Sequence, residues 1–198
     1  MKLPDFKTFF DSPNNASNRS APSSLETQDV ARIPTRANDE QQQVSAMREQ
    51  LPPRCLADIL VSSYFRNYEA SYRILHIPSF FDQYERMWSQ ADQASNIFVA
   101  TVLSVMSIGC SLHPTRLPDG SSAAELARRY MGIVDTWLTG RGSRPQQVLP
   151  VLQIGCLLAI SQKANAIQSG MSWVTTGKLL RNAFAAGLHR DPSYLTKC

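Results

Sequence analysis

Cysteine and histidine are scarce in this sequence, and the few that occur lie far apart. The 198 residues include 4 cysteines and 3 histidines. No two cysteines form a C-x-x-C pair and the histidines do not cluster, so the spacing typical of a zinc site or a disulfide framework is missing. We therefore predict no metal site and no cofactor in this chain, and the cysteine usage favours a reducing compartment.

Motifs of common enzymes are also missing. The sequence has no P-loop, no G-x-G-x-x-G nucleotide-binding loop and no G-x-S-x-G nucleophile turn. His76, His113 and His189 have no partner at a spacing typical of a catalytic triad, and the three-residue step from Cys110 to His113 is weak evidence for a nucleophile and base. A histidine that hydrogen-bonds a backbone group at a turn is the simpler interpretation of His76. We predict no catalytic residue and a protein that is not an enzyme.

Charge of one sign does not accumulate in any segment. The 20 basic and 16 acidic side chains leave a formal net charge of +4. No run of five or more like charges occurs, which is the pattern that marks a nucleic-acid-binding arm. The sequence therefore identifies no DNA-binding residue.

One uncharged segment, residues 93–115, raises the question of a membrane span. Its unbroken apolar length falls short of the roughly 20 residues that a bilayer core requires. Polar side chains recur at about every helical turn: Ser95, Thr101, Ser104, Ser107 and Ser111. We predict a central helix over residues 97–112, buried against its neighbours, and no contact with a membrane.

The first 50 residues differ in composition from the rest. They are rich in serine, asparagine, glutamine and proline, and they include a run of three glutamines at 41–43. Such a segment has too little apolar surface to offset the entropy of ordering. We predict a disordered polar tail over residues 1–50 and one helical domain over residues 51–198.

Apolar residues recur at helical spacing through that domain. A first helix is predicted from Pro53 to about Arg73, and a second follows Pro78. A capping box formed by Ser122 and Glu125 opens a later helix. No segment shows convincing strand alternation. The prediction is an all-α fold in which about six helices pack as a single domain.

The stretch from residue 172 to residue 194 has the clearest helical pattern. An apolar series recurs at steps of four, three, four and four, which places its members on one helix face: Trp173, Gly177, Leu180, Phe184 and Leu188. We predict a buried helix that begins at Ser172 and ends at a left-handed Gly187. A glycine inside a helix costs about 1 kcal/mol relative to alanine, so Gly177 is expected to let a neighbouring backbone approach closely.

Two motifs together resemble a known family. The first is a Tyr-Phe pair followed by Leu-His-Ile-Pro-Ser-Phe at 75–80, and the second is a tryptophan and a glycine followed by Gly-Leu-His-Arg-Asp-Pro-Ser at 187–193. Over about residues 51–194 the chain is similar to the fungus-specific transcription factor domain, the regulatory middle region of fungal zinc-cluster transcription factors. The motif residues are Tyr64, Phe65, His76, Pro78, Phe80, Trp173, Gly177, Gly187, Leu188, His189, Arg190, Asp191 and Pro192.

This resemblance implies that DNA binding and regulation are carried out by different domains. In such proteins a cluster of six cysteines binds two zinc ions and places a short helix on DNA. The 4 cysteines here are scattered, so the family zinc cluster is absent from this sequence. The sequence also stops soon after the second motif, where the family domain continues through further helices. A fragment of a longer regulator, a gene-model error and a genuine short paralogue all remain open.

The function that the resemblance implies is transcriptional regulation in the nucleus. A metabolic or secondary-metabolite gene cluster is a common setting for such regulators. Protein partners or self-association would act through the helical domain, and DNA would be contacted only indirectly or through residues absent here. The alternatives are a helical protein-interaction scaffold without a transcriptional role and a small ligand-binding helical domain. If further helices normally cover the Trp173 face and residues 97–112, this chain is expected to expose a large apolar patch and to associate.

Overall fold

The structure, a computed structural model, describes six ranges of the chain: residues 45–89, 94–113, 116–117, 120–140, 148–166 and 172–191. Within these ranges the chain forms helices and no strand, and a single isolated bridge pairs Arg116 with Ser122. The predicted all-α class is therefore confirmed. The predicted polar tail falls outside the described residues, except for residues 45–50.

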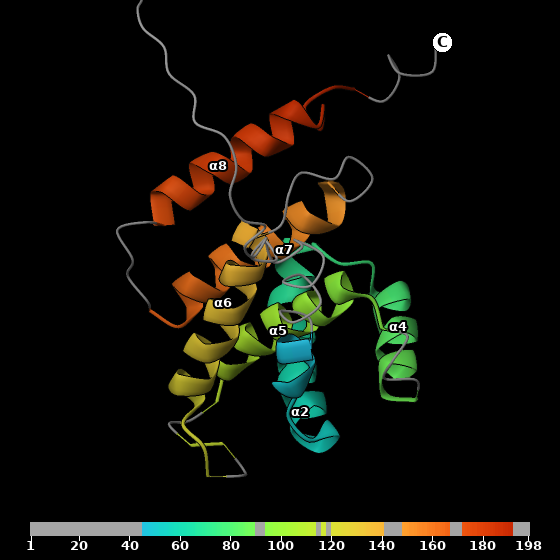
Figure 1. Cartoon of the computed structure of the whole chain (residues 1–198), viewed down its shortest axis with the longest axis vertical. Helices are drawn as coiled ribbons and strands as arrows, with labels where there is room; N and C mark the ends of the chain where they lie inside the picture. Colours follow the sequence, from blue (N-terminus) through green and yellow to red (C-terminus); the bar gives the residue numbers. More distant parts are fainter. Residues whose placement is uncertain are drawn as a thin grey trace, which may run out of the picture. The chain divides into compact units, whose positions relative to one another are not determined.

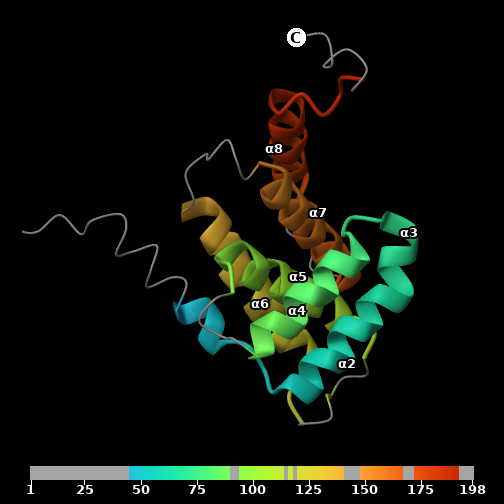
Figure 2. The same ribbon diagram turned by 90° about the vertical axis from the view of Figure 1, so that its right-hand side faces the viewer.

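In the part of the chain that the structure describes, the following helical segments succeed one another after the turn at 45–49 (Figures 1 and 2). They are α2 (Arg54–Tyr64), η2 (Phe65–Glu69), α3 (Ala70–Tyr72), α4 (Ile77–Ser89), α5 (Asn96–Cys110), α6 (Ala123–Gly140), α7 (Val148–Ala164) and α8 (Ser172–Ala185). The first three run on without a break, because η2 is a π-helical segment between two α-helical ones. Arg73 then stops the helix in a left-handed conformation with φ 48°, near the end that the sequence predicts.

Helix α5 is the centre of the domain. It packs against α2, α6 and α7 (Figure 1), and every residue from Phe98 to Cys110 is buried. A helix that is apolar on all sides is stable in this setting only when neighbours cover all of its faces. The predicted buried central helix is confirmed. Among the helices that the structure describes, none has both the length and the apolar character needed to cross a membrane.

Backbone contact between α5 and α2 depends on a glycine. A Cβ atom placed on Gly109 would lie 2.2 Å from the carbonyl oxygen of Leu60. No real Cβ comes so close to a backbone atom, so any larger residue at 109 forces the two helices apart. Nothing in the local sequence around Gly109 indicates a helix crossing, so this contact could not be predicted from sequence.

Buried polar groups join α5 to α7. The hydroxyl oxygens of Ser107 and Ser161 lie 2.7 Å apart. Asn165, just beyond α7, donates from Nδ2 to the carbonyl oxygen of Ser107 at 2.9 Å. Three of the serines that argue against a membrane span are thus hydrogen-bonded inside the domain, as buried polar groups must be: Ser104, Ser107 and Ser111.

A short helical turn precedes α2 and contacts the hydrophobic core. Residues 45–49 form a helical turn whose Met47 is only 1% exposed and belongs to the hydrophobic core. Arg48 donates from its guanidinium to the carbonyl oxygen of Ala94. One buried methionine does not alter the average composition of a polar stretch, so composition gives no signal for this contact.

Local signals account for the starts of α6 and α7, and the predicted capping box is confirmed in part. The backbone N–H of Glu125 donates to Ser122 Oγ at 3.4 Å, which is one half of the predicted capping box, and α6 ends at Gly140. Pro150 is the third residue of α7, within the first turn, where its missing N–H has no helical partner to lose.

Candidate interaction surface

The first motif is built around a buried carboxylate. The hydroxyl of Tyr64 is buried and donates to the side chain of Glu69, which is itself 2% exposed. The second carboxylate oxygen of Glu69 accepts the backbone N–H of Leu75 at 2.9 Å. Burial raises the pKa of Tyr64 above its usual range, and the hydrogen bond to Glu69 raises it further. Glu69 therefore ties α2 to the turn that precedes α4.

Sequence reasoning missed Glu69 because an acidic residue in a helix is normally solvated. The one usable signal is its place among aromatic residues, between Tyr68 and Tyr72. The π-helical segment matters as well, since it changes which side chains share a face and turns Glu69 toward Tyr64.

Aromatic rings bring the two halves of the first motif together. The ring of Phe65 lies 4.9 Å from that of Phe80 and 4.9 Å from that of Phe81, measured between centroids. Phe80 also packs 5.4 Å from Phe98 of α5. Tilted rings at these separations add a specific attraction to their burial. Phe65 lies in η2 and Phe80 lies in α4, so the contact between their rings fixes α4 on the domain.

His76 has a structural role at the start of α4. Its Nδ1 lies 2.7 Å from Ser79 Oγ and accepts the backbone N–H of Ser79 at 3.4 Å. Its carbonyl oxygen accepts the N–H of Phe80 at 3.0 Å. His76 thus caps the helix in the position where serine or aspartate is usual. Pro78 lies in the first turn, where it costs no hydrogen bond. The predicted structural histidine is confirmed.

The other histidines also pack against neighbours. His113 Nε2 lies 3.0 Å from Ser63 Oγ, which joins the end of α5 to α2. The ring of His189 lies 5.1 Å from that of Phe184.

Burial raises the pKa of the Cys110 thiol to about 12. A thiol with so high a pKa is a poor nucleophile.

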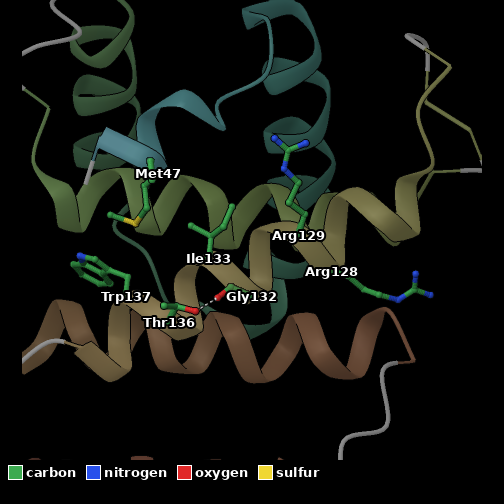
Figure 3. A pocket seen from close by; sticks show the side chains of 8 residues that line it. Met47, Arg128, Arg129, Gly132, Ile133, Thr136 and Trp137 are labelled. Atoms are coloured by element: carbon green, nitrogen blue, oxygen red, sulfur yellow. Dashed lines mark hydrogen bonds between the residues drawn. The ribbon is translucent and has the colours of Figure 1, made fainter. Parts of the chain in front are cut away.

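Two cavities lie beside these elements, and both are largely apolar. One, of about 330 Å³, lies between α4, α5 and α7, with Phe80, Phe98 and Gln153 among its lining residues. The other, of about 410 Å³, lies between the 45–49 turn and α6. In Figure 3 the guanidinium groups of Arg128 and Arg129 point away from Trp137. The charged groups therefore do not converge on a ligand position.

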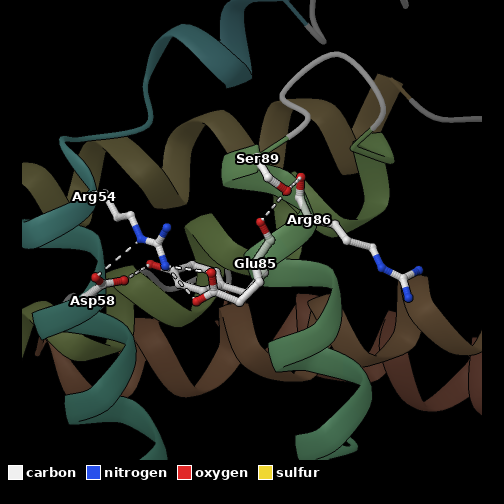
Figure 4. A network of polar contacts seen from close by, with 6 residues as sticks. Arg54, Asp58, Glu85, Arg86 and Ser89 are labelled. Atoms are coloured by element: carbon white, nitrogen blue, oxygen red, sulfur yellow. Dashed lines mark hydrogen bonds and ion pairs between the residues drawn. The ribbon is translucent and has the colours of Figure 1, made fainter.

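A polar network holds α4 against α2 (Figure 4). Arg54 Nη2 lies 2.7 Å from each carboxylate oxygen of Glu85. Arg54 also pairs with Asp58 at 3.7 Å, and Asp58 accepts the hydroxyl of the buried Tyr84 at 2.8 Å. Burial, followed by that hydrogen bond, raises the pKa of Tyr84. Because Arg54, Asp58 and Glu85 are solvated, the network orients α4 more than it stabilises the fold.

Helix α8 carries the second motif and packs against α7 (Figure 2). Its stop signal is confirmed: Gly187 has φ 76°, its N–H donates to Phe184, and the N–H of Leu188 donates to Ala183. This pair of hydrogen bonds is the Schellman arrangement that the Gly-Leu sequence predicts. Beyond it, Arg190 and Asp191 are exposed. Pro192 lies outside the described residues, and Trp173 is described only as a position in α8.

The prediction that the apolar face of α8 is buried is wrong. Leu180 is 56% exposed, Phe184 51% and Leu188 56%. Their spacing puts them on one side of the helix, but α7 contacts a different side. Periodicity reports which residues share a face, and it does not report whether anything covers that face. The expectation of an uncovered face thus agrees with α8, whereas the same expectation for residues 97–112 is wrong because α5 is buried.

The prediction for Gly177 is also wrong. A Cβ atom at Gly177 would meet no atom within 4 Å. The close approach beside α8 occurs instead at Gly155 of α7, where a Cβ would lie 2.8 Å from Cδ1 of Leu179. Gly155 therefore provides the space that seats α8 on α7.

Helix α7 connects the regions that carry the two motifs. Gln153 donates from Nε2 to the carbonyl oxygen of Ile74 at 2.7 Å, at the turn of the first motif. Two residues later in α7, the side chain of Leu179 of α8 packs against Gly155. Among the described residues, no group of three or more His, Cys, Asp or Glu side chains could hold a metal ion.

Comparisons with known proteins show which family has these features. The model of the fungal specific transcription factor domain matches residues 61–197. The transcription factor opdR of Penicillium oxalicum is 33% identical over 142 residues, which is 72% of this chain and 18% of that protein. The equisetin cluster transcription factor eqxF of Fusarium heterosporum is 25% identical over 158 residues, 73% of this chain and 22% of that protein.

A third relative, the Zn(2)-C6 fungal-type transcription factor pigI of Monascus ruber, is 25% identical over 145 residues, 72% of this chain and 18% of that protein. The chain thus spans about a fifth of the length of these relatives. No solved structure matches it. The family is one of transcription factors. The two motifs and the match over residues 61–197 together show that the chain belongs to the fungal specific transcription factor domain family.

Proposed function

We propose that this chain supplies the regulatory and interaction region of a fungal zinc-cluster transcriptional regulator, and that it works in the nucleus. The observation that carries the proposal is the family match over residues 61–197, together with relatives that are named transcription factors. The chain acts as a regulator and not as an enzyme. In support, the polar side chains of the first motif, Glu69 and His76, are occupied by hydrogen bonds that hold the fold together.

DNA contact comes from residues outside this sequence or from a partner protein. The 4 cysteines of the sequence are isolated, whereas a zinc cluster of this type needs six close together. One relative carries the description Zn(2)-C6 in its name. Because a separate DNA-binding domain contacts the DNA, the helical regulatory region needs no basic arm of its own.

The regulated genes belong to a secondary-metabolite cluster. This part of the proposal is supported by the relative that is named for the equisetin cluster. Regulation acts through protein contacts made by the helical domain, which is supported by the uncovered apolar face of α8.

The test is deletion of the gene followed by transcript profiling under conditions in which the gene is expressed. We expect a co-ordinated change in a group of clustered genes, restored by a complementing copy of the wild type. A copy that carries Leu149→Gln, a substitution at an exposed position of α7, should restore it equally. Unchanged transcripts in every expressing condition would contradict the regulatory role, and a tagged copy that stays outside the nucleus would favour a scaffold function.

A further inference from the structure

The cavity of about 330 Å³ between α4, α5 and α7 has an apolar floor and a polar rim. Phe80, Phe98 and Thr101 are its buried lining residues, and the two phenylalanine rings lie 5.4 Å apart. A concave apolar site with a few polar groups is the usual form of a small-molecule site, and such sites span about 300 to 1,000 Å³. The exposed polar residues at the rim are His76, Ser79, Gln83 and Ser95.

The cavity and α8 lie on opposite sides of α7. Gln153 lines the cavity, whereas Gly155 packs against Leu179 of α8. Positions two residues apart in an α-helix differ by about 200° around its axis. The cavity is therefore separate from the exposed apolar face of α8, and the described residues that line it belong to α4, α5, α7 and the turns beside them.

Hydrogen-bonding groups in the cavity wall are open to a ligand. Gln153 donates one N–H to the carbonyl oxygen of Ile74 at 2.7 Å. A side-chain amide has a second N–H and an oxygen that accepts, and these make no hydrogen bond within the described residues. His76 Nδ1 accepts the N–H of Ser79, so the neutral ring carries its proton on Nε2 and donates from there. Ser95 precedes α5 without a side-chain cap hydrogen bond.

Charge decides which class of molecule fits this cavity. None of the described residues that line it is an aspartate, glutamate, lysine or arginine. A charged ligand would lose part of its hydration on entry without gaining an opposite charge, which is costly. An uncharged polar group loses less hydration, and the amide of Gln153 can replace the lost hydrogen bonds.

We propose that this cavity binds an uncharged small molecule that contains a ring and an amide or other carbonyl group. The ring packs against Phe80 and Phe98, and the polar group exchanges hydrogen bonds with Gln153. Because the walls belong to three helices, the bound molecule joins α4 to α5 and α7. This site goes beyond the proposed function. Any regulatory meaning of the ligand rests on that function, whereas binding is measured on the purified chain, so either can fail without the other.

Nuclear magnetic resonance of the isotope-labelled chain tests this proposal with three probes of similar size: benzamide, benzoate and benzylammonium. We expect uncharged benzamide to shift the backbone amide signals of Phe80, Phe98 and Gln153 until they saturate. Its dissociation constant should be on the order of 1 mM, because the molecule is small. Benzoate and benzylammonium should bind at least about tenfold more weakly, because each carries a charge that nothing in the cavity matches.

Two matched variants locate the site. Ser95→Trp places a large side chain at the rim of the cavity and should abolish the binding of benzamide. Ser62→Trp makes the same change at an exposed position of α2 outside the cavity, and it should bind benzamide as the wild type does. Both variants should melt as the wild type does, because both serines are exposed and neither hydroxyl makes a hydrogen bond within the described residues.

Three results would overturn the proposal. The absence of saturable shifts with benzamide would mean that the cavity holds only water. Equal binding of the three probes would mean that charge does not select the ligand. Binding that survives Ser95→Trp would place the site elsewhere in the chain.

Discussion

Helices α5 and α8 are both predicted from apolar patterns, yet the structure uses them in opposite ways. In α5, apolar residues occur on all sides and neighbouring helices cover them, α2, α6 and α7 among them. In α8 they form one stripe, and α7 packs against a different side. A helix that is apolar all round must be enclosed, whereas a striped helix can be a core element or a binding surface. The comparison indicates that α5 holds the domain together and that α8 presents a surface.

Thiol reactivity should show the largest difference between the two helices. Cys110 at the end of α5 is buried. In variants that keep one thiol each, we expect Cys110 to react with a disulfide reagent at least about a thousandfold more slowly than a cysteine introduced by Leu180→Cys, because it reacts only after unfolding. Similar rates would mean that α5 opens as readily as α8.

The burial of Cys110 should also make the free energy of unfolding depend on pH in the alkaline range. Burial raises the pKa of Cys110 from 9.0 to about 12, so the folded state keeps a proton that the unfolded state releases. The stability that this thiol contributes is fully present below pH 9 and is lost as the pH rises toward 12. The free energy of unfolding, measured in urea from pH 8 upward, should fall less steeply in a Cys110→Ala variant.

Truncation of leucine should give the next largest effect. Leu103 of α5 is fully buried, so Leu103→Ala should lower the free energy of unfolding by about 2 to 5 kcal/mol through lost burial and the cavity left behind. The matched change Leu180→Ala in α8 should stay within about 0.5 kcal/mol. Urea unfolding measures both. Equal costs would mean that the α8 face is covered in solution.

Replacing glycine with alanine should change the free energy of unfolding in opposite directions in the two helices. Gly109→Ala places a Cβ against the backbone of Leu60, and we expect a loss of about 1 to 3 kcal/mol from overpacking. A neutral result in thermal and urea unfolding would show that α2 and α5 do not cross so closely.

Gly177→Ala is the counterpart in α8 and should have the smallest effect. Its Cβ would enter open space, so alanine should raise the free energy of unfolding by about 0.5 to 1 kcal/mol through better helix propensity. A destabilised variant would mean that a Cβ at Gly177 meets a neighbouring atom, which the structure does not show.

Local signals explain what the sequence predicts correctly. The helix over residues 97–112, the cap at Ser122 and the stop at Gly187 each depend on residues within a few positions of one another. Capping and periodicity are properties of a short segment, so they can be recognised without knowledge of the rest of the fold.

The remaining features depend on residues that are far apart in the chain. Gly109 matters because Leu60 crosses it, and Met47 is buried although its neighbours in sequence are polar. The exposure of Leu180 and Phe184 depends on where α7 lies. The second motif identified the family correctly, but its pattern alone could not distinguish a core face from an open one.

Hydrogen–deuterium exchange of the free, monomeric chain tests most directly whether α5 holds the domain together while α8 presents a surface. Amides of α5 should exchange only through global unfolding. Those of α8 should exchange through local opening, with a free energy at least about 2 kcal/mol lower, because α8 is held along one side. Protection of α8 equal to that of α5 would contradict the account, since it would mean that the apolar face of α8 is part of the core.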